Sequence, residues 1–247
     1  MKISAACIQF TAGPDWASHA DVVTALVRQA ADAGARFIVT PENTGGIRKD
    51  KDRAVQEAPV EAEHPTIAAF TKLAHDLGIW LLCGSVSVRD KADDRLPRNR
   101  SLMFGPNGRI YARYDKIHLF DVDLPTGEKH RESDRIAPGN HAVIADAAGA
   151  RVGLSICYDI RFPHLYRGLA KGGAQIITVP AAFTVPTGQA HWETLLRARA
   201  IENGAYVLAP AQTGFHEGGR QTWGHSLMID PWGRVLQDAG DQPGVIM

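Results

Sequence analysis

Residues 101–109 read SLMFGPNGR, and residues 226–234, which begin 125 positions further along (226 against 101), read SLMIDPWGR. In the first copy Asn107-Gly108 follows an apolar run, a combination that favours a β-hairpin turn. The second copy places a Pro and a Gly at the same points. Because a hairpin pairs its two strands antiparallel, the repeated segment predicts an antiparallel hairpin in each half of the chain.

The segments before the two hairpins also follow one order. Apolar periodicity with Gly or Pro boundaries predicts strand, helix, strand, helix and strand in each half. The ranges are 3–10, 16–33, 36–40, 65–77 and 79–88 in the first half, and 152–156, 163–171, 176–179, 191–203 and 206–209 in the second. Gly78 and Gly204 follow the second helix of each half.

This repeat predicts the fold class. One half alone would leave a face of its sheet uncovered, and stacking the two halves covers both faces. We therefore predict an α/β fold, a four-layer α-β-β-α sandwich built from two similar halves, with residues 1–247 as a single domain. One open doubly wound sheet is the alternative, and the two hairpins argue against it.

The composition limits the classes of function. Lys and Arg number 27, as do Asp and Glu, so the chain lacks the basic excess of nucleic-acid binders. Three widely separated cysteines do not form a disulfide framework and indicate a reducing compartment. The sequence has no convincing secretory signal and no apolar run long enough to span a bilayer. We expect a cytoplasmic protein with neither a membrane nor a nucleic acid as partner.

Cys157 is the cysteine whose surroundings indicate chemistry. It lies in SICYDIRFP (residues 155–163), where a strand ends just before a helix. A helix N-terminus favours anions and lowers the pKa of a thiol, so we predict a reactive Cys157. Cys7 and Cys83 lie inside predicted strands and are interpreted as core residues.

Two charged residues follow predicted strands. Glu42 comes after the strand 36–40, where the second half has only Ala181, and a carboxylate in the cleft can act as a general base. Lys116 follows the first hairpin, where a cation can hold a thiolate and stabilise an oxyanion. Taken singly, each signal is weak, and Glu42 alone would be interpreted as a solvated loop acid and Lys116 as a surface lysine beside Asp115. His118 offers an alternative base for a Cys–His dyad.

Taken together, these segments resemble the nitrilase, or carbon–nitrogen hydrolase, superfamily over nearly the whole chain. The segments are PEN at 41–43, KIHLFD at 116–121 and ICYDIRFP at 156–163, supported by GHS at 224–226 and DPWG at 230–233. The resemblance implies an α-β-β-α sandwich and a triad of Glu42, Lys116 and Cys157.

The resemblance also implies a reaction. Glu42 takes the thiol proton, Cys157 attacks the amide carbon and ammonia leaves, while Lys116 and the backbone N–H of Tyr158 bind the oxyanion. Water activated by Glu42 then hydrolyses the thioester. The family has a second glutamate after the lysine that orients the lysine and the substrate. Glu128 and Glu132 are both available, and we choose Glu132 because Glu-Ser before Pro-Gly matches the family's pattern.

Residues 180–184 and 187–202 look like the Nit branch, which contains deaminated-glutathione amidase and ω-amidase. Arg161, Phe183 and Thr184 are expected to contact the substrate, a small amide. The resemblance implies no metal and no cofactor, and it implies a homo-oligomer. The chain stops at Met247, apparently inside a strand, where related chains usually continue into a tail that contacts a neighbouring subunit; this puts tail-dependent assembly in doubt.

Several other functions stay open from the sequence. Within the superfamily these are a nitrilase and an N-carbamoyl hydrolase. Outside it they are a thiol hydrolase that uses His118 or His164 as its base, and a binding scaffold that has lost turnover.

Overall fold

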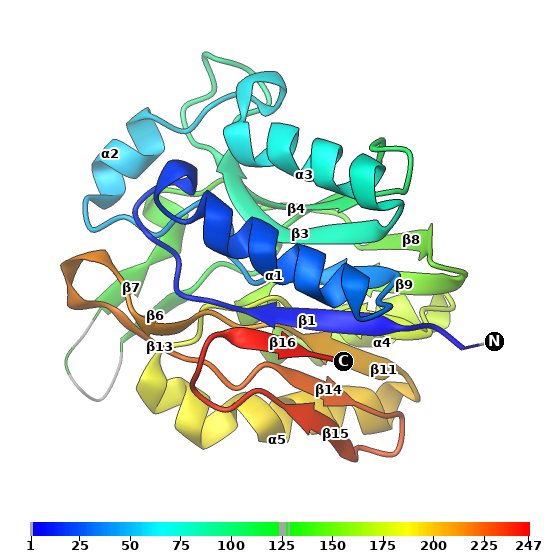
Figure 1. Cartoon of the computed structure of the whole chain (residues 1–247). Helices are drawn as coiled ribbons and strands as arrows, with labels where there is room; N and C mark the ends of the chain where they lie inside the picture. The colour runs from blue at the N-terminus through cyan, green and yellow to red at the C-terminus, as the bar shows by residue number, and fades with distance from the viewer. Residues whose placement is uncertain (1, 124–126, 128) are drawn as a thin grey trace.

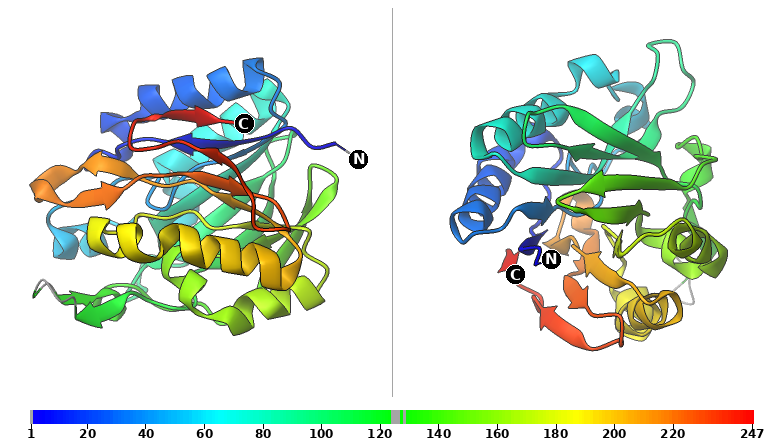
Figure 2. Two further views of the ribbon diagram at one scale, coloured as in Figure 1. Left: turned by 90° about the horizontal axis from the view of Figure 1, so that it is seen from below. Right: turned by 90° about the vertical axis from the view of Figure 1, so that its right-hand side faces the viewer.

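The computed structural model describes residues 2–123, 127 and 129–247. Two six-stranded sheets lie face to face, with helices on the outside of each (Figure 1; Figure 2). Helices α1 (Ala20–Asp32) and α3 (Pro65–Leu77) cover one sheet, and α4 (Pro163–Lys171) and α5 (Val185–Asn203) cover the other. The predicted α-β-β-α sandwich is confirmed, and the alternative prediction of a single open, doubly wound sheet is wrong.

The two sheets have equivalent strand orders. The first runs β16 (Gly244–Ile246), β1 (Ala5–Gln9), β2 (Phe37–Val39), β3 (Trp80–Val88), β4 (Arg98–Phe104), β5 (Ile110–Asp115). The second runs β8 (Val143–Ala147), β9 (Ala150–Leu154), β10 (Ile176–Thr178), β11 (Tyr206–Ala209), β14 (Leu227–Ile229), β15 (Val235–Asp238).

Pairing within the sheets confirms the internal repeat. In each sheet three strands are parallel, and the hairpin β4–β5 or β14–β15 is added antiparallel at one side. Gly78 and Gly204 end the equivalent helices α3 and α5 in the same left-handed conformation, with φ of 61° and 59°. An antiparallel strand lies at the other side of each sheet. It is β8 in the second sheet, whereas in the first it is β16, from the far end of the chain.

Alternate residues of the first sheet enter two different cores, as a strand period of two requires. Ile8, Ile38 and Leu81 pack outward against α1 and α3. Val39 and Leu82 point the other way, into the core that faces the second sheet. Cys7 and Cys83 are fully buried in β1 and β3, which bears out their interpretation as core residues.

Most predicted elements are present, with one consequential difference. The last helix was predicted from residue 191 and begins instead at Val185. Pro186 occupies the first helical turn, where its fixed φ is favourable. Gly188 lies against Trp223, where a Cβ would come within 2.2 Å of the indole ring. This extra helical segment carries Thr187, which lines the pocket described below.

Some elements have no counterpart in the prediction. The helix predicted from residue 16 begins with a separate 3₁₀ turn at Trp16–Ser18. The unpredicted elements are α2 (Lys51–Gln56), the hairpin β6 (Asp121–Asp123)–β7 (Lys129–Arg131), the hairpin β12 (Thr213–Phe215)–β13 (Gln221–Trp223) and β8. Across the described residues, no helix combines the length and apolarity needed to cross a membrane.

Candidate active site

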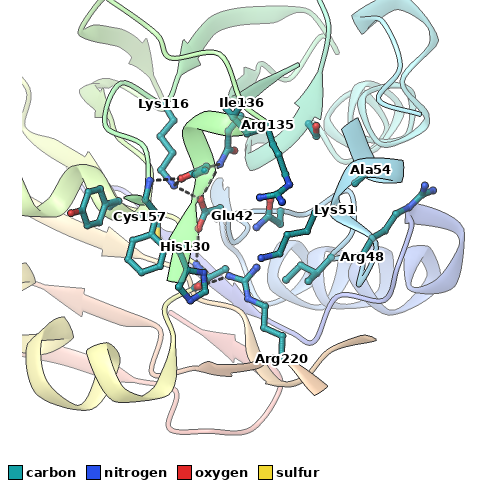
Figure 3. Close-up of a pocket in the computed structure, with 18 of the residues that line it drawn as sticks. Glu42, Arg48, Lys51, Ala54, Lys116, His130, Arg135, Ile136, Cys157 and Arg220 are labelled. Carbon is teal, nitrogen blue, oxygen red and sulfur yellow. Dashed lines mark hydrogen bonds and ion pairs between the residues drawn. The ribbon is translucent and has the colours of Figure 1, made fainter. Parts of the chain in front are cut away.

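The predicted catalytic residues meet in one pocket, and three of them directly follow strands of the two large sheets. Glu42 follows β2, Lys116 follows β5 and Cys157 follows β9, and Glu132 comes from the 3₁₀ turn Glu132–Asp134 after β7. All four line a pocket of about 210 Å³, and Figure 3 shows Glu42 between Lys116 and the pocket interior. Strands of both sheets therefore deliver side chains to one point.

Glu42 is held from three sides and is only 3% exposed. Its Oε1 accepts hydrogen bonds from Lys116 Nζ at 2.9 Å and from Asn99 Nδ2 at 3.0 Å. Its Oε2 accepts one from the backbone N–H of Ala182 at 2.9 Å. Each carboxylate oxygen therefore has at least one donor and a defined direction.

Lys116 bridges two carboxylates. Its Nζ lies 2.9 Å from Glu42 Oε1 and 2.9 Å from Glu132 Oε2. Glu132 Oε2 also accepts the backbone N–H of Phe120 at 2.7 Å, and its Oε1 accepts Asn99 Nδ2 at 3.2 Å. Glu132 thus stands where the second glutamate was predicted, while the alternative, Glu128, lies outside the described residues.

The charges of this group stabilise one another. Burial alone would raise the pKa of Glu42, but the charge of Lys116 and its hydrogen bond outweigh burial and hold that pKa below its usual value. Burial likewise disfavours the charge on Lys116, yet Glu132 and Glu42 raise its pKa well above the usual range. At neutral pH the Glu42 carboxylate is therefore charged and lies beside the charged Lys116 ammonium.

Cys157 lies in a strained turn beside Glu42. Its φ of 48° is in the left-handed region, which costs energy for a side chain other than Gly and is typical of functional sites. Its backbone N–H donates to Pro180 O at 2.9 Å, and its thiol hydrogen-bonds the Glu42 carboxylate.

The predicted lowering of the Cys157 pKa is wrong. Burial, followed by the negative charge of Glu42, raises that pKa well above its usual value, although Lys116 opposes the rise. The helix N-terminus has little influence because Cys157 begins a 3₁₀ turn, and α4 starts only at Pro163. The resting thiol is therefore protonated, and it faces a carboxylate that can take the proton.

Neither histidine considered as an alternative base lines the pocket. The Nδ1 of His118 lies 2.7 Å from Asp159 Oδ1, and its ring stacks on Phe162 at 3.7 Å. His164 is exposed on α4. The buried Asp159 also accepts the Tyr114 hydroxyl at 2.6 Å, so it ties the Lys116 segment to the Cys157 turn.

The predicted substrate contacts divide into two groups. Tyr158, Phe183 and Thr184 line the pocket. Arg161 is not among the lining residues; its guanidinium lies 5.7 Å from the Tyr158 ring centre and 5.8 Å from that of Phe183. Arg161 therefore lies near two residues of the pocket wall, Tyr158 and Phe183.

Two site residues were missed from the sequence. Asn99 lies outside every element predicted from the sequence, although it is the second residue of β4 and donates to both glutamates. Arg220 precedes the short strand β13, which has no recognisable periodicity. For Asn99 the available signal was its position directly before the apolar run of the hairpin.

Residues 4–247 match the carbon-nitrogen hydrolase family. A deaminated glutathione amidase from Yersinia enterocolitica is 38% identical, over 98% of this chain and 83% of that protein. One from Dictyostelium discoideum is 45% identical, over 87% of this chain and 76% of that protein.

The fold is shared with solved structures. The Caenorhabditis elegans NitFhit protein superposes with a TM-score of 0.90 at 35% identity; the match covers 99% of this chain but only 60% of that longer protein. An amidase from Nesterenkonia sp. AN1, in which acrylamide has added to the active-site cysteine, superposes with a TM-score of 0.85 at 25% identity, over 99% and 91% of the two chains. This protein therefore belongs to the carbon-nitrogen hydrolase family and acts on carbon–nitrogen bonds other than peptide bonds.

Proposed function

We propose that this protein is an amidase that hydrolyses a small linear amide through a thioester on Cys157. The observation that carries the proposal is the contact between a protonated, buried thiol and the charged Glu42, which Lys116 and Ala182 hold in place. A thiol of raised pKa needs a neighbouring base to become a nucleophile. Glu42 is that base here.

The proposed reaction has two halves. Glu42 accepts the thiol proton as Cys157 Sγ attacks the amide carbon, and the oxyanion is bound by Lys116 Nζ and the Tyr158 N–H. The carbon–nitrogen bond then breaks, and the departing nitrogen takes the proton from Glu42. Water, deprotonated by Glu42, attacks the thioester; the acid leaves and Cys157 regains its proton. Glu132 keeps Lys116 in position through both halves.

We propose a deaminated-glutathione-amidase-like or ω-amidase-like substrate, because relatives at 38–45% identity carry the former name. The two candidate substrates differ in their leaving group. An ω-amide releases ammonia. In deaminated glutathione the amide nitrogen belongs to the cysteinylglycine part, so hydrolysis releases a primary amine instead.

The test follows both products across a panel of deaminated glutathione, ω-amides, N-carbamoyl compounds and nitriles. We expect amide hydrolysis, by release of cysteinylglycine or of ammonia, to exceed hydrolysis of the nitriles. Cys157→Ala should abolish product release and leave the thermal unfolding midpoint nearly unchanged, whereas Cys83→Ala should keep turnover and lose stability through a cavity. Near-normal turnover by Cys157→Ala would refute the mechanism, and faster turnover of nitriles or N-carbamoyl compounds would favour those functions.

We also propose a cytoplasmic homo-oligomer. All three cysteines are free, which suits a reducing compartment. Ile201 on α5 and Trp232 in the β14–β15 turn are large, exposed apolar side chains, 55% and 85% exposed, and such side chains are frequent at subunit contacts. Sedimentation velocity on the wild type and on Trp232→Ser would test the oligomer, and a monomeric wild type would contradict it.

A further inference from the structure

The pocket mouth has an unequal distribution of charge. Its lining contains the cations Arg48, Lys51, Arg131, Arg135 and Arg220. Among its described lining residues the only acids are Glu42 and Glu132, and both already hold Lys116. The outer pocket is therefore cationic, and in Figure 3 the side chains of Lys51 and Arg220 both point toward the middle of the pocket.

Three of these arginines are paired with acids outside the lining. Arg48 pairs with Glu57, Arg131 with Asp123 at 2.8 Å, and Arg135 with Asp52 at 3.2 Å. Because the three carboxylates are between 43% and 81% exposed, water and salt weaken these pairs. The pairs position the arginines without cancelling the positive potential inside the pocket.

Arg220 differs from the other arginines because none of the described acids forms an ion pair with it. Its Nη2 donates to Ala182 O at 3.0 Å, while its Nε is buried and has no hydrogen-bond partner. A half-buried guanidinium that keeps unused donors beside a pocket carries a desolvation cost, and an anion can offset that cost. Carboxylate is the anion that matches its planar fork.

Arg220 also lies close to the reacting groups. The same Ala182 that accepts from Arg220 donates its N–H to Glu42 at 2.9 Å, and the charge of Arg220 acts on Glu42. A group bound by Arg220 therefore lies near Ala182, whose backbone also acts on the Cys157 thiol. The acyl part of a substrate stays attached to Cys157 after the nitrogen leaves, so this is the part that Arg220 can hold throughout the reaction.

We infer that Arg220 determines specificity by binding a carboxylate on the acyl part of the substrate, so that the enzyme selects anionic amides over neutral ones. This inference rests on the proposed amidase function and adds the charge of the substrate to it. Lys51, which lines the same pocket, is a second cation there but lacks the bidentate geometry of a guanidinium. An anionic acyl group also explains the cationic mouth, which attracts such a substrate.

The test compares glutaramate with its neutral isostere glutaramide. On the Cys157→Ala protein, calorimetry should give tighter binding of glutaramate, and adding Arg220→Met should weaken glutaramate binding relative to glutaramide by roughly 10- to 100-fold. On the active enzyme, the ratio of kcat/KM for the two amides should fall by a similar factor. Arg220→Lys should recover part of that ratio because it restores the charge but not the fork. Arg109→Met, at the exposed hairpin turn, removes one positive charge outside the pocket and should leave the ratio as in the wild type.

The outcomes separate the inference from the proposed function. If the wild type hydrolyses neither amide but Cys157→Ala binds glutaramate more tightly than glutaramide through Arg220, the proposed turnover of such amides fails while the carboxylate site at Arg220 stands. If Arg220 has a purely structural role, acting through Ala182 and Glu42, its replacement should lower kcat/KM equally for both amides. The ratio of the two kcat/KM values would then be unchanged, and that result overturns the inference. Failure of Cys157→Ala to bind glutaramate also overturns it.

Discussion

The two halves of the chain place the same elements at the same edge but differ in the residues that follow equivalent strands. β2 is followed by Pro41-Glu42, and its counterpart β10 by Pro180-Ala181. The first half supplies a charged side chain. The second supplies only backbone groups: Pro180 O accepts the Cys157 N–H, and the N–H of Ala182, two residues further along, donates to Glu42.

This difference shows how a duplicated scaffold acquires a reaction. Duplication brings equivalent strand ends together, but two carboxylates at this point would repel and raise the pKa of one of them. A small residue in one copy leaves room for the glutamate of the other and offers it a fixed donor. The four predictions below alter the first half's contribution and then compare the two halves, from the largest expected effect to the smallest.

Glu42→Gln should remove the base that only the first half of the chain supplies, while keeping the size and shape of the side chain. Because the amide cannot accept the Cys157 proton, thioester formation should slow by roughly 10²- to 10⁴-fold. Single-turnover kinetics would measure this step, and Glu63→Gln, the same change on an exposed residue, is the control. Equal losses in His118→Asn would instead support a Cys–His mechanism.

Lys116→Met should lower kcat by on the order of 10²–10³, the typical cost of losing an oxyanion donor. Because Lys116 opposes the rise in the pKa of Cys157, its removal should raise that pKa further and slow thiol alkylation at neutral pH. Steady-state kinetics and alkylation rates measured against pH would show both effects. Lys116→Arg should restore activity only partly, and Lys72→Met on the exposed face of α3 is the control. An unchanged kcat would remove Lys116 from the reaction.

Asn99→Ala should have an intermediate effect, because Asn99 positions the two glutamates and contacts neither Cys157 nor Lys116 through its described side-chain hydrogen bonds. Loss of a hydrogen bond to a charged group predicts a fall in kcat of roughly 10- to 100-fold with a smaller change in KM. Without this donor the Glu42 carboxylate is less stabilised, so the acid limb of the pH profile should move upward. Asn107→Ala at the hairpin turn is the control. A lower kcat with an unmoved acid limb would indicate a merely structural residue.

The smallest effect concerns stability, with one buried histidine from each half. Burial lowers the pKa of His64 and of His216 from 6.5 to about 4. The unfolded chain therefore binds protons that the folded protein does not, so stability is full above about pH 6.5 and falls as the pH drops toward 4. Each histidine can account for on the order of 3 kcal/mol over that window.

His64→Asn tests this effect without losing the helix cap. The Nδ1 of His64 accepts the Thr66 N–H at the start of α3, and Asn is a favoured residue at that position. Urea unfolding at pH 7.5 and pH 5 should show a smaller acid loss in His64→Asn than in the wild type, while His141→Asn, on an exposed residue, should behave like the wild type. If all three proteins lose the same free energy of unfolding between pH 7.5 and pH 5, the assignment of this pH dependence to His64 is contradicted.

The sequence predicted those parts of the fold that carry a regular period and clear boundaries. Helices α3 and α4 begin at Pro and end beside Gly, and their observed limits equal the predicted ones. The start of α5 was missed because Gly188 is unfavourable inside a helix until its contact with Trp223 is known.

For the site, too, the residues that follow a regular, clearly bounded element could be predicted and the others could not. Glu42, Lys116 and Cys157 each follow a strand that could be recognised, so their meeting at one edge could be predicted. Asn99 and Arg220 make contacts that only the packed structure creates, and the single local signal was the position of Asn99 just before the predicted hairpin. The pKa of Cys157 was predicted in the wrong direction because burial, which sequence does not reveal, outweighs the local backbone.

The position of β16 has a consequence for how the protein forms during synthesis. The first sheet contains β1 at its beginning and β16, residues 244–246, as the strand that covers the edge of β1. A nascent chain that has completed β1–β5 therefore still has an unpaired sheet edge while the whole second half is being translated. Such edges are templates for pairing with other chains, so we expect this half to be most prone to aggregation until β16 has been translated.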